Sequence, residues 1–254
     1  MSDVLDFAQH LAEVADRLSM GYFRRDPAAR RKFDGTIVTE ADEAVERALR
    51  TEISAAFPTH AVLGEEEGGP DTQDAPTWIV DPIDGTINFA SGVPIWGTLI
   101  AHAVDGEVVA GVVSAPALGE RYHAVRGGGA YRNGERIGVS AVDDLAEVYL
   151  SYGTWRHFEQ FGWGGGFERA IRAVRTSRGL GDFWGHMLVA SGAVDVMVEP
   201  VVAVWDLAPL IVIVEESGGR FTDLNGSRTI AGGSALSTNG RVHEEVLSLF
   251  RPNP

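Results

Sequence analysis

The chain has 254 residues and 44% of them are hydrophobic, so it is long enough to bury a large core within one unit spanning residues 1–254. Its 36 Asp and Glu outnumber its 21 Lys and Arg, and the resulting formal charge of −15 argues against a nucleic-acid partner while favouring cations. The absence of cysteine excludes disulfides, thiolate zinc sites and cysteine nucleophiles.

No segment has the pattern of a targeting signal or a membrane span. The first residues, "MSDVLDFAQHLAEVADRL", carry charges throughout and lack the apolar region of a signal peptide. The longest apolar stretch, "LAPLIVIV" at 207–214, is far shorter than the roughly 20 residues that span a bilayer. We therefore expect a cytoplasmic protein with no membrane partner.

Two helices are predicted near the start of the chain. Apolar residues recur at helical spacing over 3–23, which predicts an amphipathic helix. A basic, breaker-rich connection follows at 24–35. The sequence "TEAD" at 39–42 has capping-box spacing, with Asp in place of the usual Glu or Gln, and predicts the beginning of a second helix that Pro58 ends.

Strands are predicted to follow these helices. The run 78–80, Trp-Ile-Val, predicts a short buried strand that ends in a turn containing Pro82 and Gly85. Residues 93–137 have the pattern of an antiparallel meander, with hairpin turns at Asp105-Gly106 and Asn133-Gly134.

The pattern changes near residue 145 to alternating strands and helices. The predicted strands lie near 147–152, 193–198 and 220–224, and the predicted helices near 167–175, 182–191, 206–216 and 241–250. The glycine-rich segment 161–167 is interpreted as a flexible loop. The fold class is therefore α/β, with an α+β half at 1–144 and an α/β half at 145–254.

Five acidic residues occupy unusual positions. Asp81 and Asp84 directly follow the predicted strand, and two like charges held so close repel unless a proton or a cation lies between them. Asp42 shares the apolar face of its helix, Glu65 follows a buried-looking strand, and Asp206 ends an apolar segment. The seven histidines show no metal-binding spacing, so hard oxygen ligands suited to Mg²⁺ are favoured over a zinc site.

Each of these acids alone has a simpler structural interpretation. The segment 81–85 makes an ordinary turn, and 65–67 can be a solvated acidic run. Asp206 can cap a helix, and Asp42 can complete the cap of Thr39. Together, however, several acids at strand ends behind apolar residues would be costly without a cation. The pattern predicts a divalent-metal site and does not by itself name a reaction.

Several motifs, taken in order, resemble those of the inositol monophosphatase family. They are "GEE" at 64–66, "DPIDGT" at 81–86 with "NF" at 88–89, "WDLA" at 205–208 and "EESGG" at 215–219. The resemblance implies a layered α-β-α-β-α sandwich acting as one catalytic unit, and a homodimer. It also implies Mg²⁺-dependent hydrolysis of a small phosphorylated metabolite, with two or three ions per site.

The resemblance also implies residue roles. The metal ligands would be Glu65, Asp81, the carbonyl of Ile83, Asp84 and Asp206. Thr86 would orient the attacking water together with Glu65, with Asp42 behind them, and the amides of Gly85 and Thr86 would hold the phosphate. The implied mechanism is direct attack of a metal-activated water on phosphorus, without a phosphoenzyme.

The segment 177–200, with "GD" at 181–182, resembles the histidinol-phosphatase branch of the family. Its implied substrate, histidinol phosphate, carries an ammonium and an imidazole, and Asp182 and Glu199 would supply carboxylates for that end. The structural alternatives are a helix N-cap for Asp182 and a surface acid for Glu199. Arg178 either holds one of these acids and joins the substrate site, or is a surface charge.

Three questions stay open from the sequence. One of Arg30, Arg31 and Lys32 is expected to approach the site, and Trp155 or Trp163 either stacks on an imidazole or packs in the core. The runner-up activity is that of an inositol-1-monophosphatase or a related sugar or nucleotide phosphatase. The alternative outside enzymes is a partner-binding protein of the same fold.

Overall fold

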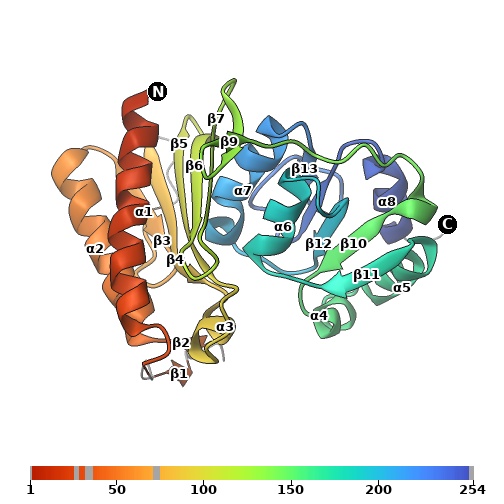
Figure 1. The fold of residues 1–254 in the computed structure, drawn as a ribbon, viewed down its shortest axis with the longest axis horizontal. Helices are drawn as coiled ribbons and strands as arrows, with labels where there is room; N and C mark the ends of the chain where they lie inside the picture. The colour runs from red at the N-terminus through yellow and green to blue at the C-terminus, as the bar shows by residue number, and fades with distance from the viewer. Residues whose placement is uncertain (1, 26–28, 32–36, 71–74, 252–254) are drawn as a thin grey trace.

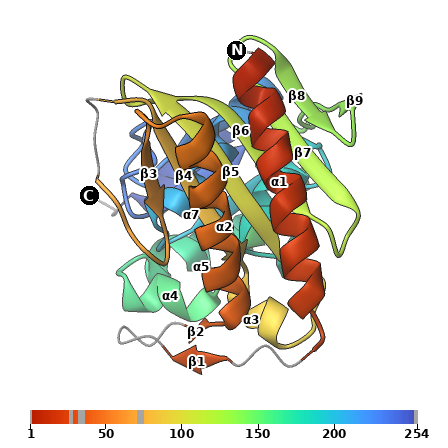
Figure 2. The same ribbon diagram turned by 90° about the vertical axis from the view of Figure 1, so that its left-hand side faces the viewer.

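The computed structural model describes residues 2–25, 29–31, 37–70 and 75–251. Its elements form five layers, which Figure 1 shows from one side to the other. Helices α1 (Ser2–Tyr22) and α2 (Glu40–Ala56) form the first layer, and Figure 2 shows them side by side across one face of the first sheet. Helices α6 (Phe183–Ala190) and α7 (Val204–Glu216) lie between the two sheets. Helices α4 (Trp155–Gln160), α5 (Gly164–Ala173) and α8 (His243–Phe250) form the last layer, so the predicted α-β-α-β-α sandwich is confirmed.

The first sheet has seven strands in the order β3-β4-β5-β6-β7-β8-β9. Their bounds are Ala61–Gly64, Thr77–Asp84, Gly97–Val104, Glu107–Ala115, Glu120–Val125, Gly129–Arg132 and Glu135–Arg136. All pairs are antiparallel except β3 with β4. Asp105 and Asn133 have positive φ angles of 52° and 50°, each followed by a glycine with positive φ, which confirms the two hairpin turns.

Strand β4 runs four residues further than predicted. It continues through Asp81 and Pro82 to Asp84, with a shift of register between the two aspartates. Pro82 has no N–H for the ladder, so an irregularity is expected here, and the Pro82 carbonyl instead accepts a hydrogen bond from Thr98 Oγ1 at 2.8 Å. The aspartates therefore sit on a bulged strand end and not in a simple turn.

Alternate residues of β4 face different layers. Trp78 and Val80 pack in the cluster formed with α1 and α2, whereas Ile79 packs in the cluster that contains α6 and α7. Asp81 follows Ile79 by two residues and so belongs to the same face. The strand therefore delivers Asp81 toward α7.

The second sheet has five strands in the order β11-β10-β12-β14-β13. Their bounds in that order are Thr176–Gly179, Tyr149–Tyr152, Val196–Glu199, Ala235–Thr238 and Arg220–Thr222. Strand β10 pairs in parallel with β11 and β12, and the other pairs are antiparallel. Strands β11 and β14 and helix α4 were not predicted, because they are only four to six residues long and lack a clear period.

The interpretation of 161–167 as a flexible loop is wrong. Helix α5 begins at Gly164 and includes all three consecutive glycines. A Cβ atom on Gly166 would lie 2.8 Å from Phe250 Cδ1 and 2.9 Å from Phe250 Cα, so the glycine permits α5 to pack closely on α8.

Four smaller elements complete the described structure. Strand β1 (Arg30–Arg31) pairs with β2 (Ile37–Val38), and the short helix α3 (Thr86–Ala90) follows β4. A 3₁₀ turn, η1 (Leu145–Glu147), precedes β10. Over the residues that the structure covers, no helix combines the length and apolar character needed to cross a membrane.

Candidate active site

Three of the predicted carboxylates meet at one point. Asp81, Asp84 and Asp206 each place an oxygen within 4.8 Å of the others. Asp81 and Asp84 come from the end of β4, and Asp206 comes from the first turn of α7. The cluster thus joins residues from both halves of the chain.

A backbone N–H orients each carboxylate of this cluster. Asp81 accepts the N–H of Ile83 at 2.9 Å, and Asp84 accepts that of Phe183 at 2.7 Å. Ala203 is the N-cap residue of α7, and Asp206, at the third position of the helix, accepts the backbone N–H of Ala203 at 2.8 Å. Asp206 therefore does cap the start of α7, although from the third helical position and not from the N-cap position. The same side chain also belongs to the carboxylate cluster.

Burial and mutual repulsion make the ionised cluster unfavourable by itself. The pKa of Asp206 is raised to about 7, first by burial and then by the charges of Glu199, Glu65 and Asp182, while the hydrogen bond from the Ala203 N–H opposes the rise. Burial first, and neighbouring carboxylates second, hold the pKa of Asp81 and of Asp84 well above the usual range. A divalent cation would relieve this repulsion, and a donor set of carboxylate oxygens fits Mg²⁺.

A cavity of about 330 Å³ opens over the cluster. Eight of the predicted site residues line it, together with Arg31. The eight are Glu65, Asp81, Ile83, Asp84, Gly85, Thr86, Asp182 and Asp206. Gly85 has a φ of 82°, and a Cβ there would lie 3.1 Å from the Ile95 carbonyl oxygen. This position therefore favours glycine for both its backbone angle and its close contact.

Asp42 combines the two interpretations that the sequence left open. Its Oδ2 accepts the N–H of Thr39 at 2.8 Å and completes the capping box of α2. Its Oδ1 lies 3.3 Å from Thr86 Oγ1, which in turn lies 3.0 Å from the carbonyl oxygen of Ile83. Burial raises the pKa of Asp42 to about 6, with Glu65 adding to the rise and the bonds from Thr39 opposing it.

A second, smaller cavity of about 110 Å³ lies beside the first. Asp84, Asp182 and Asp206 line both cavities, and Glu199 lines only the second. Asp182 precedes α6 but makes no side-chain cap, and Glu199 is only 8% exposed, so neither simple structural alternative holds. Burial first, and Glu199 second, raises the pKa of Asp182 to about 6.

His186 is a contact of Glu199 that the sequence did not predict. The ring is fully buried, with Nε2 3.0 Å from Glu199 Oε2 and Nδ1 2.7 Å from Ser237 Oγ. Histidines were considered only for metal-ligand spacing, and His186 lies alone in the apolar helix "FWGHMLVA". A histidine in so apolar a helix was the signal available, because a buried ring needs hydrogen-bond partners.

Arg178 lies on the surface. Its Nη1 donates to the Ser177 carbonyl at 2.7 Å and lies 3.2 Å from Thr176 Oγ1, and the side chain is exposed on β11. It lines neither of the two acidic cavities. The expectation that Arg178 holds one of the acids is therefore wrong, because its own strand takes up the guanidinium.

The remaining open residues divide between the site and the packing. Arg31 lines the larger cavity, whereas Arg30 pairs with Glu43, and Lys32 lies outside the described residues. Trp163 packs against the cluster of α5 and α8, as an ordinary core role predicts. Trp155 is 54% exposed and lines neither acidic cavity.

Comparisons with known proteins agree with this geometry. The family model described as "Inositol monophosphatase family" matches residues 1–253. Histidinol-phosphatases of Mycobacterium tuberculosis and Streptomyces coelicolor are 45% and 42% identical to the chain, and each match covers 97% of both sequences. The solved structure of the Thermotoga maritima IMPase superposes with a TM-score of 0.88 at 36% identity, covering 98% of this chain and 96% of that one. With its carboxylate cluster in a sandwich of this architecture and matches over nearly its whole length, the chain belongs to the inositol monophosphatase family.

Proposed function

We propose that the protein is a Mg²⁺-dependent phosphomonoesterase that hydrolyses histidinol phosphate to histidinol and phosphate. The observation that carries the proposal is that Asp84, Asp182 and Asp206 line both acidic cavities. A phosphate held over the metal cluster would therefore place the rest of the molecule beside Asp182 and Glu199. The named relatives support this choice of ester, since both are histidinol-phosphatases.

The residues of the larger cavity divide between binding and orientation. Glu65, Asp81, Asp84, Asp206 and the Ile83 carbonyl would hold two or three ions. When bound, Mg²⁺ supplies charge neutralisation for the transferring phosphoryl group and acidifies a water.

The hydroxyl of Thr86 gives the water its orientation. Thr86 Oγ1 lies 3.0 Å from the Ile83 carbonyl oxygen and 3.3 Å from Asp42 Oδ1, and its one proton is donated to one of these two acceptors. The oxygen of Thr86 would then accept a hydrogen bond from the attacking water, which Glu65 would orient together with Thr86. Gly85 and Thr86 line the cavity, and their backbone amides would donate to the phosphate oxygens.

The smaller cavity would recognise the cationic end of the substrate. Histidinol phosphate carries an ammonium and an imidazole, and inositol phosphates carry only hydroxyls at this end. A hydrogen bond between a carboxylate and a cation is roughly twice as strong as one between neutral groups, so Asp182 and Glu199 favour the charged ligand. His186 holds one oxygen of Glu199 and thereby fixes the direction of the other.

The assembly proposed is a homodimer in which each chain is one catalytic unit. Asp81 and Asp84 come from residues 1–144 and Asp206 comes from residues 145–254, so neither half alone carries the complete cluster. Light scattering after size-exclusion chromatography would measure the assembly; a monomeric mass would contradict the dimer.

Phosphate release from a panel of esters tests the function. We expect turnover of histidinol phosphate with Mg²⁺, none after exhaustive chelation, and slower turnover of inositol 1-phosphate and glycerol 2-phosphate. Preference for inositol 1-phosphate would establish the runner-up activity. No turnover of any ester with Mg²⁺ would favour a protein that binds a partner on this fold.

A further inference from the structure

An ion pair of α2 lies largely inside the molecule and is not part of the carboxylate cluster. Glu46 is fully buried, and Arg50, one helical turn further along, has a side chain that is 19% exposed. Arg50 Nε donates to Glu46 Oε1 at 2.9 Å. Such a pair is weak evidence for stability by itself, because taking two charges out of water can cost more free energy than their attraction contributes. The other contacts of the two side chains indicate a different role.

Both oxygens of the Glu46 carboxylate bond to the turn 64–68, which begins where β3 ends. Oε2 accepts the N–H of Glu66 at 2.7 Å, and Oε1 accepts that of Glu67 at 2.9 Å. A Cβ atom on Gly64 would lie 2.3 Å from Oε1, so a glycine at this position is what lets the carboxylate approach so closely. The turn therefore rests directly on Glu46.

Arg50 holds the carbonyl side of the same turn. Its Nη2 donates to the carbonyl oxygen of Gly68, which also accepts the N–H of Gly64 at 3.0 Å and so closes the turn. Glu46 thus binds N–H groups of the turn, and Arg50 binds a carbonyl group. Together the two side chains fix the backbone around Glu65.

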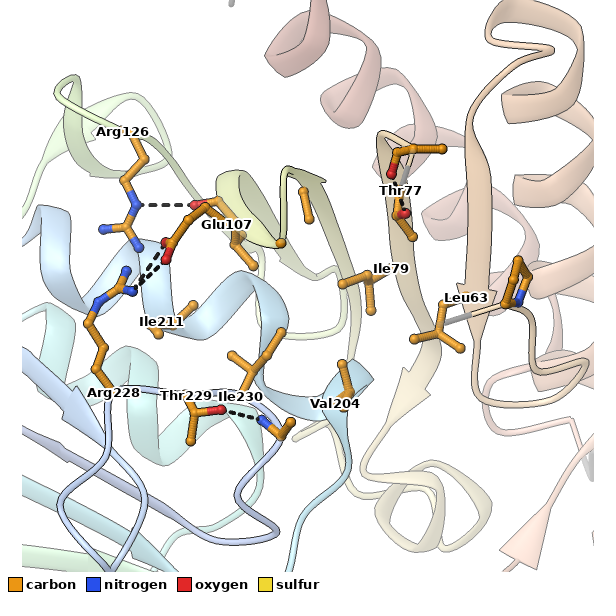
Figure 3. Close-up of a pocket in the computed structure, with 16 residues that line it drawn as sticks. Leu63, Thr77, Ile79, Glu107, Arg126, Val204, Ile211, Arg228, Thr229 and Ile230 are labelled. Carbon is orange, nitrogen blue, oxygen red and sulfur yellow. Dashed lines mark hydrogen bonds and ion pairs between the residues drawn. The ribbon is translucent and has the colours of Figure 1, made fainter. Parts of the chain in front are cut away.

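The sheet does not hold Glu65 as it holds Asp81. Strand β3 pairs in parallel with β4, and Leu63 is the partner of Ile79 in this register. Figure 3 shows these two side chains side by side on the face toward α7, and each precedes one of the two acids by two residues. Strand β4 continues through Asp81, whereas β3 ends at Gly64. The ladder therefore holds Asp81, and the backbone of Glu65 depends on the turn.

The same face of α2 also reaches Thr86. Asp42 precedes Glu46 by four residues, which places both side chains on one face of the helix, and both are fully buried. Asp42 Oδ1 lies 3.3 Å from Thr86 Oγ1. One helix thus contacts Thr86 through Asp42 and the turn of Glu65 through Glu46, and both Thr86 and Glu65 line the larger acidic cavity.

We propose that Glu46 is a positioning residue that holds the turn 64–68 so that the carboxylate of Glu65 meets the Mg²⁺ ions at a fixed place relative to Thr86. This role rests on the proposed function, in which Glu65 is a metal ligand. Glu46 lines neither acidic cavity, so it acts through Glu65. Replacing the groups that support metal ligands typically changes metal affinity or activity by about 10–100-fold.

Glu46→Gln tests the role with almost no change of shape. A carboxylate has two accepting oxygens, whereas an amide has one oxygen and one donating NH₂ group, so the N–H of either Glu66 or Glu67 would face another donor. We expect the dissociation constant of Mg²⁺, measured by calorimetry on the full chain, to rise at least about tenfold. An unchanged constant in the folded variant would overturn the proposal.

Asp223→Asn is the matched control. Asp223 is 5% exposed, and its Oδ1 accepts the N–H of Asn225 at 2.9 Å and that of Ser227 at 2.8 Å, in a turn that lines neither acidic cavity. The control therefore removes the charge of another buried carboxylate that holds a turn, and the affinity for Mg²⁺ should stay that of the wild type. Equal losses of affinity in Glu46→Gln and Asp223→Asn would overturn the proposal, because Glu46 would then support the fold as a whole.

A double-mutant cycle with Glu65→Gln separates this role from the proposed function. In a chain that already carries Glu65→Gln, Glu46→Gln should weaken Mg²⁺ binding by less than about twofold, because its effect passes through Glu65. The same loss in both backgrounds would overturn the positioning role and leave Glu65 a metal ligand. A Glu65→Gln variant that binds Mg²⁺ as tightly as the wild type would instead overturn the assignment of Glu65, and the positioning role with it.

A second variant covers the loss of stability that Glu46→Gln brings by leaving Arg50 without its charged partner. Glu46→Gln combined with Arg50→Met removes both charges of the pair, so Tm should return toward that of the wild type. The affinity for Mg²⁺ should stay at the level of Glu46→Gln, because the turn still lacks an acceptor. Recovery of the affinity together with Tm would overturn the proposal. Since every readout is Mg²⁺ binding or Tm, the results do not depend on which phosphate ester the protein hydrolyses.

Discussion

The charge of Asp84 can be separated from its hydrogen bond. Asp84→Asn keeps an oxygen that can accept the N–H of Phe183, so the fold should survive, but it removes a charged metal ligand. Loss of one well-placed stabilising group costs roughly 3–4 kcal/mol in the transition state, so we expect kcat to fall about 10²–10³-fold. Asp16→Asn, at a half-buried aspartate paired with Arg121, is the control. Retention of more than a tenth of the wild-type rate would show that Asp84 is only a structural residue.

Asp182 and Glu199 should decide selectivity and not the chemical step. Asp182→Thr and Glu199→Gln each remove one carboxylate from the cationic end of histidinol phosphate, and a buried partner of this kind is worth about 2–5 kcal/mol. The loss should fall on kcat/KM for histidinol phosphate and spare glycerol 2-phosphate, since the metal cluster is untouched. Equal losses on the two esters would mean that these acids support the fold.

At the scale of elements, the glycines of α5 offer a test of packing. Gly166→Ala gains helix propensity but drives its Cβ to 2.9 Å from Phe250 Cα, and backbone cannot move aside as a side chain tip can. We expect overpacking to lower the free energy of unfolding by about 1–3 kcal/mol.

The neighbouring glycine provides the matched control for this change. A Cβ on Gly165 meets only Arg169 Nη1, at 3.5 Å, so Gly165→Ala should stabilise by about 0.5–1 kcal/mol. Urea denaturation measures both variants. Stabilisation of the two by the same amount would show that α5 and α8 do not approach as closely as described.

Prediction from the sequence succeeded where local chemistry decides the structure. Asp105-Gly106 and Asn133-Gly134 specify turns by backbone preference alone, and Thr39 with Asp42 specifies a helix start. It failed at Gly164–Gly166, because the contact that stabilises a helix there comes from Phe250 of α8, 84 residues after Gly166. Tertiary packing outweighs propensity at such places.

Some residues of the candidate site could be predicted from the sequence, and one could not. The spacing of Asp81 and Asp84 placed them together from the sequence. Asp206 was singled out by its position at the end of an apolar segment, and the family resemblance then implied that it joins the other two as a metal ligand. His186 stayed hidden because its two partners, Glu199 and Ser237, lie 13 and 51 residues further along the chain. Nothing local in α6 indicates them.

For the whole molecule, the carboxylates make stability depend on metal and pH together. Burial raises the pKa of Asp42 and Asp182 to about 6 and that of Asp206 to about 7. In the unfolded chain these carboxyl groups lose their protons near pH 4. Between that pH and pH 6–7 the folded protein holds protons that the unfolded chain has lost, so the free energy of unfolding of the metal-free protein falls as the pH rises to 6–7. Mg²⁺ binds the ionised carboxylates and should restore that stability.

The rise in Tm on adding excess Mg²⁺ isolates this effect. Burial lowers the pKa of His102 and of His243 to about 4, which destabilises the protein in acid, but that contribution cancels when Tm is compared with and without metal at one pH. We expect a larger rise at pH 8 than at pH 5.5, measured by scanning fluorimetry. A rise in Tm that is equal at the two pH values, or larger at pH 5.5, would contradict the claim that Mg²⁺ binding stabilises the ionised forms of Asp42, Asp182 and Asp206.

Because the cluster joins Asp81 and Asp84 with Asp206, it can form only late in the synthesis of the chain. Asp206 is synthesised 122 residues after Asp84, and ribosomes add about 5–20 residues per second, so the pair waits on the order of ten seconds for its third member. During that interval the nascent chain carries the two aspartates without the residue that completes the cluster. A product that terminates early, before α7, would therefore lack a complete cluster, and the capacity to hold the ion would be acquired in a single late event.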